Sequence, residues 1–150
     1  MSDKNGSEYF RFFTEIGILE QLSRAMLQAR LPDGMLVPHF TVLNHLVRVK
    51  DGRTPLELAQ AFQVPKTTMT HTLAGLVKAG LVVMRANEDD GRSKRVWISK
   101  KGIAFRDKAI RSLDEDVERL STSFSVARVK RLLPELEAIR KTMDADRDRR

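Results

Sequence analysis

The sequence predicts a mainly α-helical chain that contains one small β-hairpin. Three observations support this fold class. Apolar residues recur every three or four positions over most of the 150 residues, which is the period of an amphipathic helix. The period changes around residues 81–98, where two short apolar runs flank a charged loop. Turn sequences such as Leu31-Pro32-Asp33-Gly34 separate the segments.

The first two segments are predicted to be helices. The pattern over residues 9–29 places Phe10, Phe13, Ile16, Leu19, Leu22 and Met26 at helical spacing. After Pro38 a second helix is expected, which ends near residues 50–52 and carries Phe40, Leu43, Leu46 and Val47 on one face.

Residues 54–80 predict two helices joined by a tight turn. Thr54 and Glu57 have the spacing of a capping box, and Pro55 suits the first helical position. The first helix therefore covers residues 56–62. The second begins near Pro65, turns Met69, Leu73, Leu76 and Val77 inward, and ends at Gly80, which suits the left-handed position after a helix.

Residues 81–98 predict a projecting β-hairpin. The runs 81–84 and 96–98 are short and apolar, as expected of strands. The loop between them is polar throughout and has its turn at Asp89-Asp90-Gly91.

From Ser99 the chain returns to a helical pattern. A heptad-like stripe is expected from Ile103 through Ile110, Leu113, Val117 and Leu120 to Phe124. A break around residues 121–125 leads to a last helix, in which Pro134 is expected to produce a kink or to mark the start. The charged run 144–150 is expected to be frayed.

Composition and charge favour a protein that binds a polyanion. The net charge is +7, and residues 46–111 hold 14 basic and 6 acidic residues, so the excess lies in the middle of the chain. The absence of cysteine excludes thiol catalysis, disulfides and thiolate zinc sites. The sequence shows neither a signal core nor a membrane span, so a cytoplasmic location is expected.

The helix-turn-helix presents a polar face on its second helix. Such a helix reads the major groove of DNA, and threonine can contact phosphates or bases. Positions 67, 68, 71 and 72 are expected opposite the apolar stripe, with Thr70 at the boundary. The candidate DNA-binding residues are Lys66, Thr67, Thr68, Thr70, His71 and Thr72.

The hairpin loop supplies a second candidate contact with DNA. Arg92, Lys94 and Arg95 are concentrated near its tip, and a narrow minor groove attracts arginine. Asp90 lies two residues before Arg92 and is expected to hold its guanidinium. The alternative is a solvated, mobile charged loop.

The stretch 90–102, DGRSKRVWISKKG, resembles the wing signature of the MarR family, D-x-R-x-x-x-V followed by Ser/Thr and a glycine. Leu58-Ala59, Met69-Thr70 and the run 76–82 match the helix-turn-helix of that family in register. The resemblance implies a wing arginine at Arg92, its supporting acid at Asp90, and a DNA-reading face at Thr67, Thr68 and Thr70. Pro65, His71 and Gln63 depart from the family pattern.

The resemblance also implies a winged helix-turn-helix domain, residues 35–100, between dimerisation segments at 1–34 and 101–150. Apolar stripes at both chain ends exceed what the winged domain can cover, which favours a homodimer. Family members often respond to an aromatic ligand, and Phe12, Phe13, His39 and Phe40 are the candidate effector-pocket residues here. No cofactor is expected.

These observations predict a sequence-specific transcription regulator, a repressor by hypothesis, on a pseudo-palindromic duplex; activation stays open. An enzyme is not expected, because His39, His45 and His71 lack metal-ligand spacing and no nucleophile elbow is present. Two alternatives remain, a winged helix used for protein contact and a nonspecific architectural DNA binder.

Overall fold

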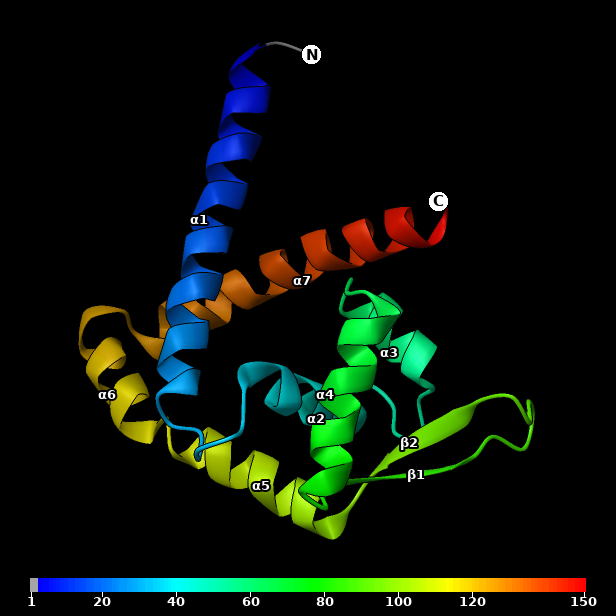
Figure 1. Cartoon of the computed structure of the whole chain (residues 1–150). Coiled ribbons are helices and arrows are strands. Elements are labelled where there is room, and N and C mark those ends of the chain that lie inside the picture. The colour runs from blue at the N-terminus through cyan, green and yellow to red at the C-terminus, as the bar shows by residue number, and fades with distance from the viewer. Residues whose placement is uncertain (1–2) are drawn as a thin grey trace. The chain divides into compact units, whose positions relative to one another are not determined.

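The computed structural model describes residues 3–150, and it describes the burial of residues 5–150. The chain divides into two compact units, one that ends at Leu113 and a second at Asp114–Arg150. Figure 1 shows the elements: α1 (Asp3–Gln28), α2 (Val37–Arg48), α3 (Pro55–Ala61), α4 (Lys66–Lys78), β1 (Val82–Ala86), β2 (Lys94–Ile98), α5 (Lys100–Arg111), α6 (Asp114–Ser123) and α7 (Val126–Asp148). The predicted fold class, helices with one small hairpin, is confirmed.

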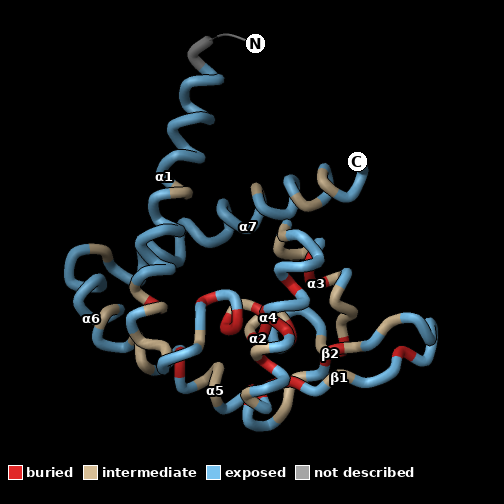
Figure 2. Tube along the Cα trace, in the orientation of Figure 1, coloured by how far each residue is buried: buried red, intermediate tan, exposed pale blue. Residues whose placement is uncertain are grey.

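The core of the first unit lies among α2, α3, α4 and the hairpin (Figure 2). Its most buried side chains are Leu43, Leu58, Leu73, Leu76, Val42, Val82 and Val96. Removing this apolar surface from water is the main stabilising contribution to the unit. Two predicted core residues are wrong: Val47 is 42% exposed and Val77 is 43% exposed, because each lies one position beyond the inward stripe of its helix.

The start of α3 confirms the predicted capping box. Thr54 Oγ1 accepts a hydrogen bond from Glu57 N at 3.2 Å, and Glu57 Oε1 accepts one from Thr54 N at 3.4 Å. A cap of this kind stabilises a helix by about 1 kcal/mol. The turn into α4 places Gln63 at a φ of 54°, the left-handed region where glycine is usual.

The end of α4 also follows the prediction. Gly80 has a φ of 73°. Its amide donates to Val77 O at 3.0 Å, and the amide of Leu81 donates to Leu76 O at 3.0 Å, which satisfies the last carbonyls of the helix.

The hairpin is longer than its apolar runs. β1 and β2 pair antiparallel: Val82 lies opposite Ile98 at one end of the ladder, and Ala86 lies opposite Lys94 at the other. Arg53 adds an isolated bridge to Val96. Because strand side chains alternate, Val82 and Val96 face the core, while Trp97 lies on the outer face.

The helix after the hairpin belongs to the first unit. Ser99 caps α5 by accepting the amide of Gly102 at 3.0 Å, and Arg106 Nε donates to Asn44 Oδ1 of α2 at 3.1 Å. A second buried cluster contains Leu27, Val37, Phe40 and Ala109. The expected continuous stripe from Ile103 to Phe124 is wrong, because α5 ends at Arg111 and the acidic start of α6 begins a new helix at Asp114.

The second unit consists of α6 and α7, and neither helix has a buried residue. α7 starts at Val126, after the cap at Ser125, so Pro134 lies inside the helix and does not mark its start. The expected fraying of residues 144–150 is also wrong. α7 continues to Asp148, and Asp144 pairs with Arg140 at 3.3 Å and with Arg147 at 3.4 Å.

The described helices include none that is long and apolar enough to cross a membrane. The division into dimerisation segments at 1–34 and 101–150 around a winged domain at 35–100 stays a prediction. In the structure α1, the winged helix and α5 belong to one compact unit.

Candidate nucleic-acid interface

The N-terminal half of α4 is open to solvent. Lys66, Thr67, Thr68, Thr70 and His71 are all exposed. Pro65 provides no side-chain cap, and the first hydrogen bond of the helix runs from Met69 N to Pro65 O at 3.1 Å. The backbone amides of the first turn, before Met69, therefore have no acceptor within the helix. Free amides at a helix N-terminus attract anions.

Thr72 does not belong to this open face, contrary to the sequence-based expectation. It is 7% exposed, and its hydroxyl donates to the carbonyl of Thr68 at 3.1 Å. The reason is helical spacing: Thr72 follows Met69 by three positions and precedes Leu76 by four, so it shares their inward face.

Asn87 organises the wing loop, a role that was not predicted from the sequence. Its side chain is buried and donates to Ser93 Oγ at 2.9 Å. The side-chain oxygen of Asn87 accepts a hydrogen bond from the backbone amide of Asp89 at 3.1 Å. The backbone amide of Asn87 donates to Ser93 O at 3.2 Å. An asparagine just before an Asp-Asp-Gly turn is a signal for such an Asx turn.

Arg95 has a structural role that differs from the predicted one. Its guanidinium donates to Asn87 Oδ1 at 3.1 Å, to Gly52 O at 2.9 Å and to Asp89 Oδ2 at 3.0 Å. The side chain is 26% exposed. Asp89, not Asp90, is therefore the wing acid that pairs with an arginine.

Arg92 and Lys94 remain open at the wing. Asp90 supports Arg92, but through the backbone: its Oδ1 accepts the amide of Arg92 at 3.0 Å. Among residues 3–150 the guanidinium of Arg92 has no hydrogen-bond or ion-pair partner. An exposed, unpaired cation held on an ordered turn is suited to binding a phosphate or a groove.

The four candidate effector residues lie in two different environments. Phe12 and Phe13 are 39% and 41% exposed and contact each other edge-to-face, whereas His39 and Phe40 are buried. A cavity of about 340 Å³ lies nearby and is lined by Glu20, Arg24, Val37, Pro38, Thr41, Val42, Phe62, Val64, Thr68, Met69 and Thr72. Its lining comes from α1, α2, the segment between α3 and α4, and α4, and it includes none of the four candidate residues.

His39 is a buried group between α2 and α4. Its Nδ1 accepts the amide of Leu36 at 2.9 Å, and its Nε2 lies against Gly75, 2.7 Å from the position a Cβ would take there. Burial lowers the pKa of His39, and the charge of nearby His71 lowers it further. The fold therefore holds a neutral imidazole, because a protonated Nδ1 could not accept the amide.

This arrangement predicts that acid destabilises the fold through His39. Since the pKa is lower in the folded than in the unfolded state, the unfolded chain binds more protons below about pH 6.5, and stability falls as the pH falls. Urea unfolding at pH 7.5 and pH 5.5 should show a smaller pH effect in His39→Gln than in the wild type. His45, whose pKa is also lowered, is present in both proteins and cancels. An equal pH effect in both proteins would contradict this assignment.

The described residues contain no group of three or more His, Cys, Asp or Glu side chains that could hold a metal ion.

Comparisons with known proteins point to one family. Residues 33–93 match a family model described as MarR family. A search of curated protein sequences finds no match. A MarR transcriptional regulator from Methanosarcina mazei Go1 has a similar structure, with a TM-score of 0.76 and 24% identity over 87% of this chain and 94% of that one.

Two further structures are similar. The transcriptional regulator BldR from Sulfolobus solfataricus gives a TM-score of 0.77 at 22% identity and covers 95% of this chain and 99% of its own. A mutant MarR from E. coli, solved in complex with operator DNA, gives 0.70 at 23% identity, with coverage of 88% and 95%. At these identities the likeness concerns the fold.

Proposed function

We propose that the protein is a DNA-binding transcription regulator that acts as a homodimer, a function supported by the match of residues 33–93 to the MarR family model. The observation that carries the proposal is the combination, on one compact unit, of the open end of α4 with the unpaired guanidinium of Arg92. A related fold, the mutant E. coli MarR, was solved with operator DNA.

α4 supplies the major-groove contact in this proposal. Thr67, Thr68 and Thr70 are exposed on its first turns. The hydroxyls of Thr67 and Thr68 can bind phosphates or base edges, and the methyl groups of all three suit thymine. The hydroxyl of Thr70 donates to Lys66 O at 2.9 Å. His71 stands where the family often has arginine, so we assign no bidentate guanine contact to this helix.

The wing supplies the second contact. Arg92 and Lys94 are both exposed, and an arginine inserted into a narrow minor groove reads the width of that groove. The two contacts together fit the net charge of +8 that residues 46–111 carry, from 14 basic and 6 acidic residues.

The apolar surface outside the winged helix supports a homodimer. Exposed large apolar side chains on the helices outside the winged helix include Tyr9, Phe10, Leu19 and Leu22 on α1, Ile103 and Ile110 on α5, Val117 and Leu120 on α6, and Val126, Val129, Leu132, Leu133, Leu136 and Met143 on α7. Surfaces of this kind mark interaction sites, and a second copy is the partner that a two-fold symmetric DNA site requires. A dimer would place its two recognition helices about 34 Å apart.

We also propose that the protein represses transcription and that a small aromatic ligand relieves this repression. The cavity of about 340 Å³ is large enough for such a ligand. It includes Thr68, Met69 and Thr72 of α4, so a bound ligand would bias the position of the recognition helix.

The test is fluorescence anisotropy with duplexes tiled across the upstream region of the gene, with scrambled duplexes as controls and a salt series. We expect tight binding to one pseudo-palindromic tile, with an affinity that falls steeply as salt rises. Analytical ultracentrifugation of the free protein should give a dimer. Equal weak binding to every duplex would favour the architectural alternative. Failure to bind any duplex at low salt would reject DNA binding and favour a protein-contact module.

A further inference from the structure

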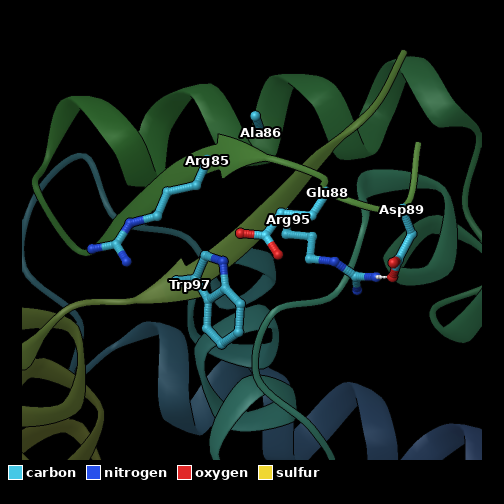
Figure 3. Close-up of a pocket in the computed structure, with 6 residues that line it drawn as sticks. All are labelled: Arg85, Ala86, Glu88, Asp89, Arg95 and Trp97. Atoms are coloured by element: carbon cyan, nitrogen blue, oxygen red, sulfur yellow. Dashed lines mark hydrogen bonds and ion pairs between the residues drawn. The ribbon is translucent and has the colours of Figure 1, made fainter. Parts of the chain in front are cut away.

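The guanidinium of Arg95 joins two parts of the first unit that are far apart in sequence. One nitrogen donates to Gly52 O at 2.9 Å, and the other two donate to Asn87 and Asp89 of the wing loop. Figure 3 shows the side chain running beneath the hairpin toward the carboxylate of Asp89, beside Trp97. Three of the five N–H donors of the side chain are therefore engaged within the protein.

The Gly52 end of this link belongs to the loop that connects α2 with α3. The loop is itself attached to β2, since Asp51 Oδ1 accepts the amide of Ile98 at 3.0 Å and Arg53 O accepts the amide of Val96 at 2.7 Å. Gly52 has a φ of 70°, and a Cβ added to it would lie only 2.5 Å from the ring of Trp97. The loop is a fixed anchor for the base of the wing.

The Asn87 end belongs to the part of the wing that lacks strand pairing. The last residues paired in the strand ladder are Ala86 and Lys94, and residues 87–93 beyond them are held by turn hydrogen bonds of the backbone and by side chains. Asn87 closes this loop onto Ser93, and Arg95 connects the closed loop to the anchor.

We infer that Arg95 is a positioning residue, which fixes the direction of the wing so that Arg92 and α4 engage one duplex together. The inference rests on the proposed function. It assigns to Arg95 no contact with DNA, and it makes Asp89 and Asn87 part of the same device. A wing that is already ordered does not have to be ordered during binding, and binding is correspondingly tighter.

Asp89→Asn separates positioning from direct contact. If Arg95 binds DNA, loss of its acidic partner frees it, and affinity stays the same or rises. If Arg95 positions the wing, affinity for the specific duplex falls by about tenfold, because the loop has lost an anchor. The Asp89 side chain is 86% exposed, so its replacement is expected to leave the core intact.

Glu88→Gln is the matched control. Glu88 is an exposed acid in the same loop and lines the same pocket as Asp89 and Arg95 (Figure 3). The variant therefore removes the same charge without touching the Arg95 hydrogen bonds. It should bind as tightly as the wild type or more tightly, because one negative charge near the phosphates is gone.

Arg95→Lys provides the second arm. Lysine keeps the charge but loses the planar fork that reaches three acceptors. We expect about a tenfold loss of affinity, because the wing loop loses its link to Gly52. Affinity equal to the wild type in both Asp89→Asn and Arg95→Lys would overturn the inference.

Wing order is measured without DNA by the rate of tryptic cleavage after Arg92, followed by mass spectrometry. The emission of Trp97, the only tryptophan of the chain, reports on the Gly52 anchor in the same samples. We expect cleavage to accelerate by at least about threefold in Asp89→Asn and in Arg95→Lys, and to be unchanged in Glu88→Gln.

Unchanged cleavage in both variants would overturn the inference even if affinity fell. If the wild type bound no duplex at all, the proposed function would fail, and with it the role of Arg95 in DNA binding. The cleavage rates would then decide separately whether Arg95 orders the wing.

Discussion

Arg92→Ala is expected to weaken binding to the specific duplex by on the order of 10- to 100-fold, the usual effect of removing an arginine that reads a groove. Arg92 is exposed, its guanidinium has no partner within residues 3–150, and Asp90 holds its backbone amide at 3.0 Å. Nothing in the fold depends on the side chain, so thermal stability should not change. Anisotropy titration at two salt concentrations measures the effect.

Two further variants test whether position or charge matters at Arg92. Arg92→Lys keeps the charge but loses the planar group that favours a narrow groove, so it should recover only part of the affinity. Lys141→Ala removes one positive charge from α7, outside the proposed interface, and should bind like the wild type. Equal losses in Arg92→Ala and Lys141→Ala would show that only net charge matters, and the wing contact would be rejected.

The helix-turn-helix could be predicted from the sequence because its signals are local. The Thr54–Glu57 box sets the start of α3 through side-chain hydrogen bonds to nearby backbone amides, and Pro55 contributes its fixed φ. Gly80 likewise ends α4 in a conformation that few other residues adopt. The loss of the helical period at two short apolar runs around a charged loop located the hairpin.

The roles of individual polar residues depended on packing that the sequence does not display. Thr72 looked like part of a Thr-rich face, yet the position of the core against α4 turns it inward. Arg95 looked like one of three equivalent wing cations. Its hydrogen bond to Gly52 joins residues that lie 43 positions apart in the chain, and only the folded structure brings them together.

The break between α5 and α6 was missed for a related reason. The heptad-like apolar stripe continues through Leu113, so the pattern alone gives no end to the helix. In the structure the hydroxyl of Ser112 donates to Ala109 O at 2.6 Å, and the acidic run that begins at Asp114 favours the start of a helix. These local interactions end α5 and start α6, although the apolar pattern continues across the break.

Gly102→Ala is expected to destabilise the fold strongly. A Cβ on Gly102 would lie 2.1 Å from Leu81 O and 2.8 Å from Ile98 Cγ1. The first of these is a backbone atom, and the same carbonyl accepts the amide of Ser99 at 3.0 Å. The start of α5 would have to move away from the hairpin, breaking that hydrogen bond and weakening the Ser99 cap.

The expected cost is about 3 kcal/mol of unfolding free energy, typical of overpacking that forces a backbone shift. In a chain of this size the cost corresponds to a fall of roughly 10 °C in Tm. Differential scanning calorimetry at one fixed protein concentration measures the change. Gly91→Ala is the matched control, because a Cβ there meets nothing within 4 Å, and its Tm should stay close to that of the wild type.

The same substitution links stability to the proposed function. Because Ser99 Oγ also donates to Gly80 O at 2.7 Å, the α5 start holds the end of α4 as well as the base of the hairpin. Gly102→Ala should therefore weaken DNA binding even at temperatures where the protein remains folded, since α4 and the wing no longer share one support. A Tm within about 2 °C of the wild type would mean that the backbone absorbs the clash without cost, and this account of the junction would be wrong.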